Sequence, residues 1–157
     1  MNAQQLRFEA EELFSAYAHC LDDDRVEEWP DFFTDTGGYK IIGRDNVELK
    51  LPLATMLCTS KAMMTDRVVA IRNASVYSQR YLRHVVSGVR VVVDNVESYD
   101  VAATFVVFQT LQDEPTKVFM AGKYTGKIVF VDGKAKFREL TAIYDSLQIP
   151  GLLVIPL

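Results

Sequence analysis

The dipeptide Asp132-Gly133 connects two long runs of alternating apolar and polar residues, "KVFMAGKYTGKIVFVD" and "KAKFRELTAIYD". A two-residue Asp-Gly connection is typical of a type I′ β-hairpin. The turn fixes the register, because Val131 must pair with Lys134. We therefore expect one side of the hairpin to be mostly apolar and covered by helices. The opposing pairs on that side are predicted to be Phe130 and Ala135, Ile128 and Phe137, Gly126 and Glu139, and Tyr124 and Thr141.

Two more β segments precede the hairpin, "RYLRHVVSGVRVVVD" and "YDVAATFVVFQTL". Alternation with a period of two over such lengths predicts β-strands. A further strand is expected from Tyr39 to Val47, after a turn at Thr36-Gly37-Gly38. Helical patterns come before the long strands. The chain is therefore predicted to have an α+β fold, with N-terminal helices packed on a curved antiparallel sheet.

Three helices are expected before the long strands. Apolar residues recur at helical spacing from Ala3 to Leu21. A short second helix is predicted at Asp24, because Asp24 and Glu27 have the spacing of a capping box and Trp29 continues an apolar stripe. The third helix is expected from Ser60, as its N-cap, to Asn73. Its predicted buried stripe is Met64, Val68 and Ile71.

Length and composition limit the class of protein. The 157 residues fit a single domain, 1–157, that can bury a substantial core. No apolar run approaches the ~20 residues of a membrane-spanning helix, and the first residues lack a signal-peptide pattern, so a cytoplasmic location is expected. A formal net charge of −4 argues against nucleic-acid binding. The two cysteines, Cys20 and Cys58, are expected to be reduced thiols.

The segment "LDDDRVEEWPDFFTD" places seven carboxylates around Trp29. Residues 1–36 hold ten acidic and two basic residues (net −8), whereas residues 37–157 hold eleven and fifteen (net +4). We interpret the segment as a structural corner and not as a metal site, because it lacks the interleaved loop glycine of hard-cation sites. Asp22 and Asp23 are predicted to form an acidic outer face for docking. Their exchange for asparagine is expected to spare folding and to weaken assembly, most strongly at low salt.

Few residues are available for metal or redox chemistry. The two histidines, His19 and His84, do not provide the ligand spacing of a Rieske centre or of a mononuclear iron site. Glu139 is the candidate general acid or base, because the hairpin register turns it toward the apolar side. A carboxylate that points into a protein more often forms an ion pair with an arginine than acts as an acid or base. The arginines available for such a pair are Arg67, Arg83 and Arg90.

The segment 99–111 is apolar on both of its faces. Val101, Ala103, Phe105 and Val107 point one way, and Ala102, Val106 and Phe108 point the other. A strand of this kind in a single antiparallel sheet needs a cover on its outer side, and a partner subunit is the simplest one.

Four parts of the sequence, in order, carry a family resemblance: "LDDDRVEEWPDFF", "MMTDRVVAIRNASVYSQRYLRHVVSGV", "AGKYTGKIVFVDGKAKFRELTAIYDS" and "IPL". Together they resemble the small (beta) subunit of aromatic-ring-hydroxylating dioxygenases, especially the shorter type of terephthalate, salicylate and anthranilate oxygenases. The resemblance implies a cone-like fold of the nuclear transport factor type. It also implies a large (alpha) subunit that carries the Rieske iron–sulfur cluster and the mononuclear iron, no cofactor in this chain, and a trimer within an α3β3 hexamer.

The resemblance also suggests structural and interface residues. Asp66, Arg67 and Arg83 are expected in or beside the interior and the subunit contacts, and for Arg67 a salt bridge that holds helix against sheet is the simpler alternative. The tail "GLLVIPL", with Ile155 and Leu157, is expected either to contact the large subunit or to fold over its own sheet.

The main functional hypothesis is a non-catalytic small subunit that supports assembly of a catalytic large subunit. A stand-alone lyase or isomerase of the same fold is an alternative, with Glu139 or Asp24 as base beside His84 and Tyr17 or Tyr124. A protein that binds a small ligand without turnover is another.

Overall fold

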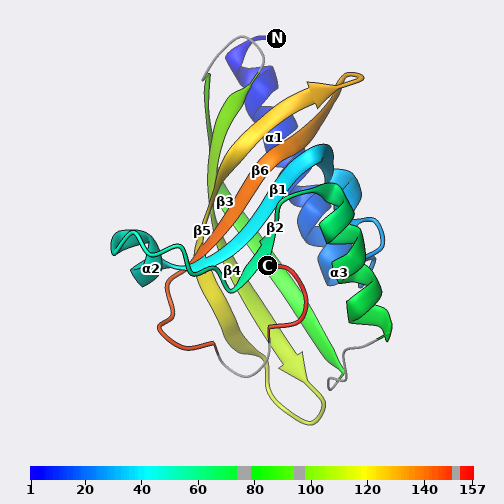
Figure 1. Ribbon diagram of the computed structural model, residues 1–157, viewed down its shortest axis with the longest axis vertical. Coiled ribbons are helices and arrows are strands. Elements are labelled where there is room, and N and C mark those ends of the chain that lie inside the picture. The colour runs from blue at the N-terminus through cyan, green and yellow to red at the C-terminus, as the bar shows by residue number, and fades with distance from the viewer. Residues whose placement is uncertain (74–78, 94–97, 150–152) are drawn as a thin grey trace.

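The computed structural model describes residues 1–73, 79–93, 98–149 and 153–157 (Figure 1). Its elements are α1 (Ala3–Asp22), η1 (Trp29–Phe32), β1 (Phe33–Gly43), α2 (Arg44–Glu48), β2 (Met56–Cys58), α3 (Lys61–Asn73), β3 (Arg80–Val93), β4 (Tyr99–Leu111), β5 (Lys117–Val131) and β6 (Lys134–Tyr144). The strands form one sheet in the order β2-β1-β6-β5-β4-β3. The α+β class is confirmed. The sheet is mixed and not fully antiparallel, because β1 pairs in parallel with β6.

The two long helices follow their predicted patterns. α1 begins with a capping box, in which the Asn2 side chain accepts from the Gln5 N–H and the Gln5 side chain accepts from the Asn2 N–H. At the start of α3 the Ser60 hydroxyl accepts from the Met63 N–H at 3.3 Å. The predicted stripes are buried, namely Leu6, Ala10, Leu13, Tyr17 and Leu21 on α1 and Met64, Val68 and Ile71 on α3.

The helix predicted at Asp24 is wrong. Asp24 has a φ of 56°, in the left-handed region, whereas an N-cap residue needs an extended backbone. The chain makes turns until η1 begins at Trp29. The carboxylates of Asp24 and Glu27 instead accept hydrogen bonds from Arg72 near the end of α3. Asp24 and Glu27 therefore have the sequence spacing of a capping box, but their side chains bind the distant helix α3.

β1 begins and ends earlier than predicted. Thr36-Gly37-Gly38 lies inside this strand, where the pairing with β6 is irregular between Phe33 and Gly38. A side chain at Gly37 would meet the Thr34 carbonyl oxygen at 2.9 Å, so the bend requires a glycine. After Gly43 the chain leaves the sheet as α2, and the strand does not continue to Val47.

The β5–β6 hairpin has the predicted turn and, close to the turn, the predicted register. Asp132 and Gly133 have φ values of 50° and 75°, as a type I′ turn requires. A β-bulge then shifts the pairing, so that Lys127 lies opposite Glu139 and Leu140 takes the inward position. Glu139 is exposed. Its predicted inward orientation is therefore wrong, and the bulge keeps its charge in water, where it carries no desolvation cost.

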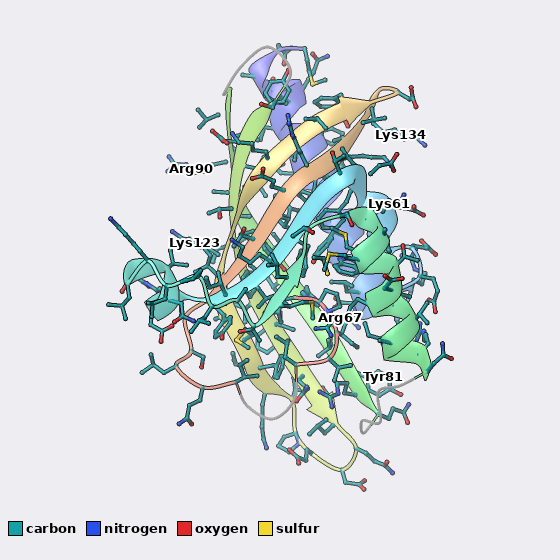
Figure 2. The ribbon with its side chains drawn as sticks, in the orientation of Figure 1. Lys61, Arg67, Tyr81, Arg90, Lys123 and Lys134 are labelled. Carbon is teal, nitrogen blue, oxygen red and sulfur yellow. The ribbon has the colours of Figure 1, made fainter. Side chains whose placement is uncertain are left out.

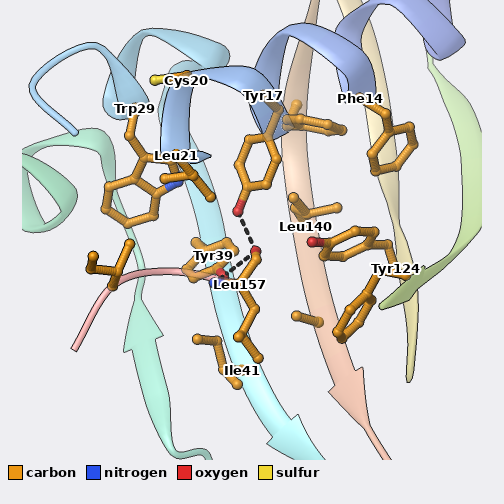
Figure 3. Close-up of a cluster of buried hydrophobic side chains, with 14 of the residues drawn as sticks. Phe14, Tyr17, Cys20, Leu21, Trp29, Tyr39, Ile41, Tyr124, Leu140 and Leu157 are labelled. Atoms are coloured by element: carbon orange, nitrogen blue, oxygen red, sulfur yellow. Dashed lines mark hydrogen bonds between the residues drawn. The ribbon is translucent and has the colours of Figure 1, made fainter. Parts of the chain in front are cut away.

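α1, η1 and α3 cover the concave side of the sheet (Figure 1). The space between them is filled by aromatic side chains that are at most 1% exposed (Figure 3). The rings of Phe105 and Tyr124 are 4.4 Å apart, and Phe14 stacks on Tyr124 at 5.5 Å. The members of this aromatic core are Phe14, Tyr17, Trp29, Phe33, Tyr39, Phe105, Tyr124 and Phe137.

Candidate functional site

Three tyrosine hydroxyls lie in the interior, where the enzyme hypothesis needs an open pocket (Figure 3). Tyr17 donates to the main-chain oxygen of Leu157 at 2.6 Å. The Tyr39 hydroxyl contacts both the oxygen and the N–H of Leu157 at 2.9 Å. The Tyr124 hydroxyl has no hydrogen-bond partner among the described residues. Two buried tyrosine hydroxyls thus hold the main chain of Leu157 in the interior.

The same burial makes these phenols weak acids. Burial raises the pKa of Tyr17 and of Tyr124 well above the ordinary value, and neighbouring tyrosines raise it further. Burial also raises the pKa of Tyr39. All three side chains are neutral near pH 7, so they act as hydrogen-bonding groups and not as bases.

Asp22 and His84 form a buried pair at the end of α1. Both carboxylate oxygens of Asp22 accept from the His84 main-chain N–H at 3.0 Å, and one is 2.6 Å from His84 Nδ1. The Asp22 side chain is 3% exposed, so its predicted place on an acidic outer face is wrong. Asp23 is on the surface beside Arg25. The pair ties α1 to β3 at the edge of the sheet, a link between residues 62 positions apart that no local sequence signal indicated.

The residues of the enzyme hypothesis do not come together. His84, Tyr17 and Tyr124 are buried, but Glu139 is on the outer side of the sheet and Asp24 binds Arg72 at the surface. His84 Nε2 is buried and lacks a hydrogen-bond partner within the described ranges. The structure therefore offers a carboxylate–histidine pair that lines a hollow between α1 and β3 together with Glu11 and His19, but it does not bring Glu139 or Asp24 to that pair.

Trp29 and Phe105, which are predicted as interface or structural residues, both belong to the core. Trp29 is fully buried and packs edge to face on Tyr39 at 5.1 Å, and Phe105 is fully buried against Tyr124. Both are structural residues. The tail also packs on its own domain, because Ile155 is 8% exposed and Leu157 is fully buried. Of the two outcomes expected for the tail, folding over its own sheet is the one observed.

The charged residues carried over from the resemblance have different environments. Asp66 is exposed and Arg67 is half-buried on α3, and the described part of the chain gives neither an ion-pair partner. The salt bridge that was the simpler alternative for Arg67 has no carboxylate partner among the described residues. Arg83 has a side chain that is 66% exposed, and its nearest carboxylate is Asp22 at 3.8 Å. Arg83 is thus available on the outer side of β3.

The residues that could hold iron do not fit either iron centre. Cys20 donates its thiol to the Arg25 carbonyl oxygen, and Cys58 is buried in β2. Burial raises the pKa of Cys20 to about 11 and also raises that of Cys58, so neither is a ready thiolate. His19 is exposed on α1 and His84 is held by Asp22. Within the described ranges no three His, Cys, Asp or Glu side chains converge as metal ligands, and no helix is long and apolar enough to cross a membrane.

The outer face of β3, β4 and β5 is a mixed apolar and basic surface, which we term the outer sheet face. Val85, Val106 and Ala121 pair across the three strands, and the next row includes Phe108 and Val118. Val85 is 49% and Val118 59% exposed. Arg90 and Lys123 lie on this face, on the side of the molecule opposite to α3 (Figure 2).

A cone-like α+β fold with a closed interior and an exposed, partly apolar sheet is typical of a domain that assembles with others. Residues 16–149 match the model of the family described as ring hydroxylating beta subunit. The chain belongs to this family, as predicted.

Known relatives cover nearly the whole chain. The chain is 34% identical over 150 residues to the anthranilate 1,2-dioxygenase small subunit of Burkholderia cepacia, which covers 96% of this chain and 93% of that one. It is 31% identical over 143 residues to a terephthalate 1,2-dioxygenase terminal oxygenase beta subunit of Comamonas sp, covering 91% and 93%. A crystal structure of an aromatic-ring-hydroxylating dioxygenase beta subunit from Novosphingobium aromaticivorans superimposes with a TM-score of 0.90, 38% identity and 99% coverage of both chains. The predicted cone-like fold is thereby confirmed.

Proposed function

We propose that this small subunit is non-catalytic and supports the assembly of a large (alpha) oxygenase subunit that carries the Rieske cluster and the mononuclear iron. The separation of the residues of the enzyme hypothesis is the observation that carries the proposal, because Tyr17 and Tyr124 are buried among aromatic side chains whereas Glu139 is exposed and Asp24 pairs with Arg72 at the surface. The small subunit would then contribute buried apolar area and charge complementarity, on the scale of obligate interfaces of ~2,000 Å² or more.

The small subunits are proposed to form a trimer within an α3β3 hexamer. A closed threefold ring joins two different surfaces on each copy. The outer sheet face, with Arg83, Arg90 and Lys123, provides a basic and apolar surface. The exposed acidic corner, with the Asp23 side chain 55% and the Asp31 side chain 70% exposed, provides an acidic one. Opposite charge supports a head-to-tail contact between them.

The substrate class is inferred from the relatives. Their names refer to anthranilate and terephthalate, which are both aromatic carboxylates. We infer that the assembly that contains this chain also acts on an aromatic ring, and that this ring carries a carboxylate or a hydroxyl. The substrate pocket belongs to the large subunit in this scheme, so substitutions on the surface of the small subunit act on assembly first.

Expression of the large subunit with and without this chain tests the role. Without the small subunit we expect loss of the hexamer in light scattering and loss of turnover of an aromatic acid. A large subunit that assembles and turns over unchanged by itself would contradict the proposal. The reading frame beside this one is expected to encode C-x-H and C-x-x-H, the spacing of Rieske ligands.

The trimer contact has its own test in the isolated chain. Charge reversal at Arg90 and Lys123 is expected to convert a trimer into monomers in light scattering. Lys134→Glu, at the exposed hairpin turn, is the matched control and should leave the trimer intact. If the chain with both charge reversals is still a trimer, the contact between copies does not lie on the outer sheet face.

A further inference from the structure

A hollow of about 480 Å³ lies between α1 and β3, which is an edge strand of the sheet (Figure 1). Its lining comes from one stripe of α1 and from the continuous stretch 83–89 of β3. Neighbouring side chains of a strand point to opposite faces, so a continuous stretch means that the hollow follows the main chain at the edge of the sheet. Its volume is within the range of roughly 300–1,000 Å³ that small-molecule sites have.

The main-chain groups of Val86 are open to this hollow. The His84 N–H donates to the Asp22 carboxylate at 3.0 Å and therefore points away from β4. In an antiparallel pair this direction alternates along the strand, and the N–H and the C=O of one residue point to the same side. Val86 follows two residues later in the same register, so both of its groups point to the open edge of β3. Within the described ranges, no turn, loop or cap hydrogen bond involves them.

An added β-strand is a poor occupant of this edge. Strand addition needs a row of outward N–H and C=O groups over several residues. On one side of Val86, the N–H of His84 is already taken by Asp22. On the other side, the pairing of β3 with β4 is irregular between Ser87 and Arg90. A short open stretch between two interruptions suits a small molecule, which needs one adjacent donor and acceptor.

Apolar side chains form one wall of the hollow beside these main-chain groups. Phe14 is 1% exposed, and Ala18 and Val89 are each 7% exposed. The side chain of Val86 is half-buried and lies in the same lining. A wall of this kind favours the flat, apolar face of a ring.

The charged groups of the hollow are already paired. The Glu11 carboxylate binds Arg7 at 2.7 Å, and the Asp22 carboxylate binds His84. Arg83 lies 3.8 Å from Asp22. A charged ligand would have to leave water without an unpaired opposite charge beside it, which is costly. A neutral ligand does not carry this cost.

We propose that the hollow binds a neutral six-membered ring with two adjacent hydroxyl groups, that is, a catechol or a vicinal ring diol. One hydroxyl accepts a hydrogen bond from the Val86 N–H, and its neighbour donates to the Val86 carbonyl oxygen. The ring lies against Phe14 and Val89. The inference goes beyond the proposed function, because the isolated chain binds this ligand without a large subunit.

Titration of the isolated chain with catechol, followed in amide NMR spectra, tests the inference. We expect saturable shifts of the amides of residues 85–89. Resorcinol has the same composition, but its hydroxyls are not adjacent, so one of the two hydrogen bonds to Val86 is lost and binding should be about tenfold weaker. Benzoate, which is charged, should bind more weakly than catechol as well. Equal responses to catechol and resorcinol, or the absence of saturation with catechol, would overturn the inference.

Two tryptophan variants of α1 separate this site from other binding. Ser15 is exposed and lines the hollow, so Ser15→Trp should fill the entrance and abolish the response to catechol. Ala16→Trp alters the next exposed position, which is outside this lining, and is the matched control that should bind normally. Ser87→Tyr closes the hollow from the strand side and gives the same test if Ser15→Trp does not fold. Binding that persists in a folded variant with a closed hollow, or shifts outside the lining alone, would contradict the assignment. Failure of the chain to assemble with a large subunit would count against the proposed function and not against this site.

Discussion

Asp22→Asn should destabilise the domain strongly, although the same exchange at the neighbouring position should not. The Asp22 carboxylate is 3% exposed and meets two donors of His84, the main-chain N–H at 3.0 Å and Nδ1 at 2.6 Å. Asparagine keeps one oxygen for these donors but places an NH₂ group where the second oxygen accepted from the main-chain N–H, so this NH₂ group becomes a buried donor without an acceptor. An unpaired buried donor together with the loss of a charged hydrogen bond costs about 2–4 kcal/mol.

Thermal unfolding of the isolated chain measures this cost. For a domain of about 150 residues, 1 kcal/mol lowers the melting temperature by about 2–4 °C, so we expect a decrease of roughly 5–15 °C. Asp23→Asn is the matched control, because the Asp23 side chain is 55% exposed and lies 3.6 Å from Arg25. Such surface pairs contribute less than about 1 kcal/mol. Equal melting temperatures for the two variants would refute the reasoning.

Four further substitutions test the interior and the surface contacts. Tyr39→Phe removes the hydroxyl that holds Leu157 and should lower the free energy of unfolding in urea by about 1–3 kcal/mol. Tyr124→Phe removes a hydroxyl without a described partner and should leave that free energy unchanged or higher; a loss as large as that of Tyr39→Phe would argue against this account. The hydrogen bond from Arg72 lowers the pKa of Glu27 from 4.5 to about 2, so its stabilisation is present above pH 4.5 and is lost as the pH falls toward 2. Arg72→Met should therefore flatten the decline of the urea midpoint in that window, and an unchanged decline would contradict it. Gly126→Val should give little folded protein by circular dichroism, because a Cβ there overlaps the main-chain oxygen of the opposite strand.

Local rules predicted the elements better than their pairing. The Asp132-Gly133 turn fixed the hairpin register as far as Ile128, because each step depends only on the step before. The bulge beyond Ile128 follows from packing, since Leu140 gains a buried position and Glu139 stays in water. A register that is counted from the turn does not predict a bulge, and so it does not predict whether Glu139 or Leu140 is buried. The candidate base Glu139 was misplaced for this reason.

Contacts between distant segments could not be predicted from local patterns in the sequence. The parallel pairing of β1 with β6, and the Asp22–His84 pair, join residues that share no local pattern. The exposed Leu49, Leu51 and Leu53 did have a signal in the sequence, because "VELKLPLATML" places apolar residues around Pro52 in a connecting loop. A connecting loop with this many leucines is unusual for a surface, and that composition indicates a partner.

The fold separates the carboxylates of "LDDDRVEEWPDFFTD", which explains why so dense a run of acids forms no common site. The left-handed conformation of Asp24 turns the chain sharply after α1, so neighbouring side chains point to different elements. Asp22 is bound by His84, Asp23 and Glu28 by Arg25, Asp24 and Glu27 by Arg72, and Asp31 by Lys61. Most of the negative charge is therefore already paired within the chain. What remains for docking is the exposed edge of the corner at Asp23 and Asp31, so the salt dependence of assembly should follow substitutions there and not at Asp22.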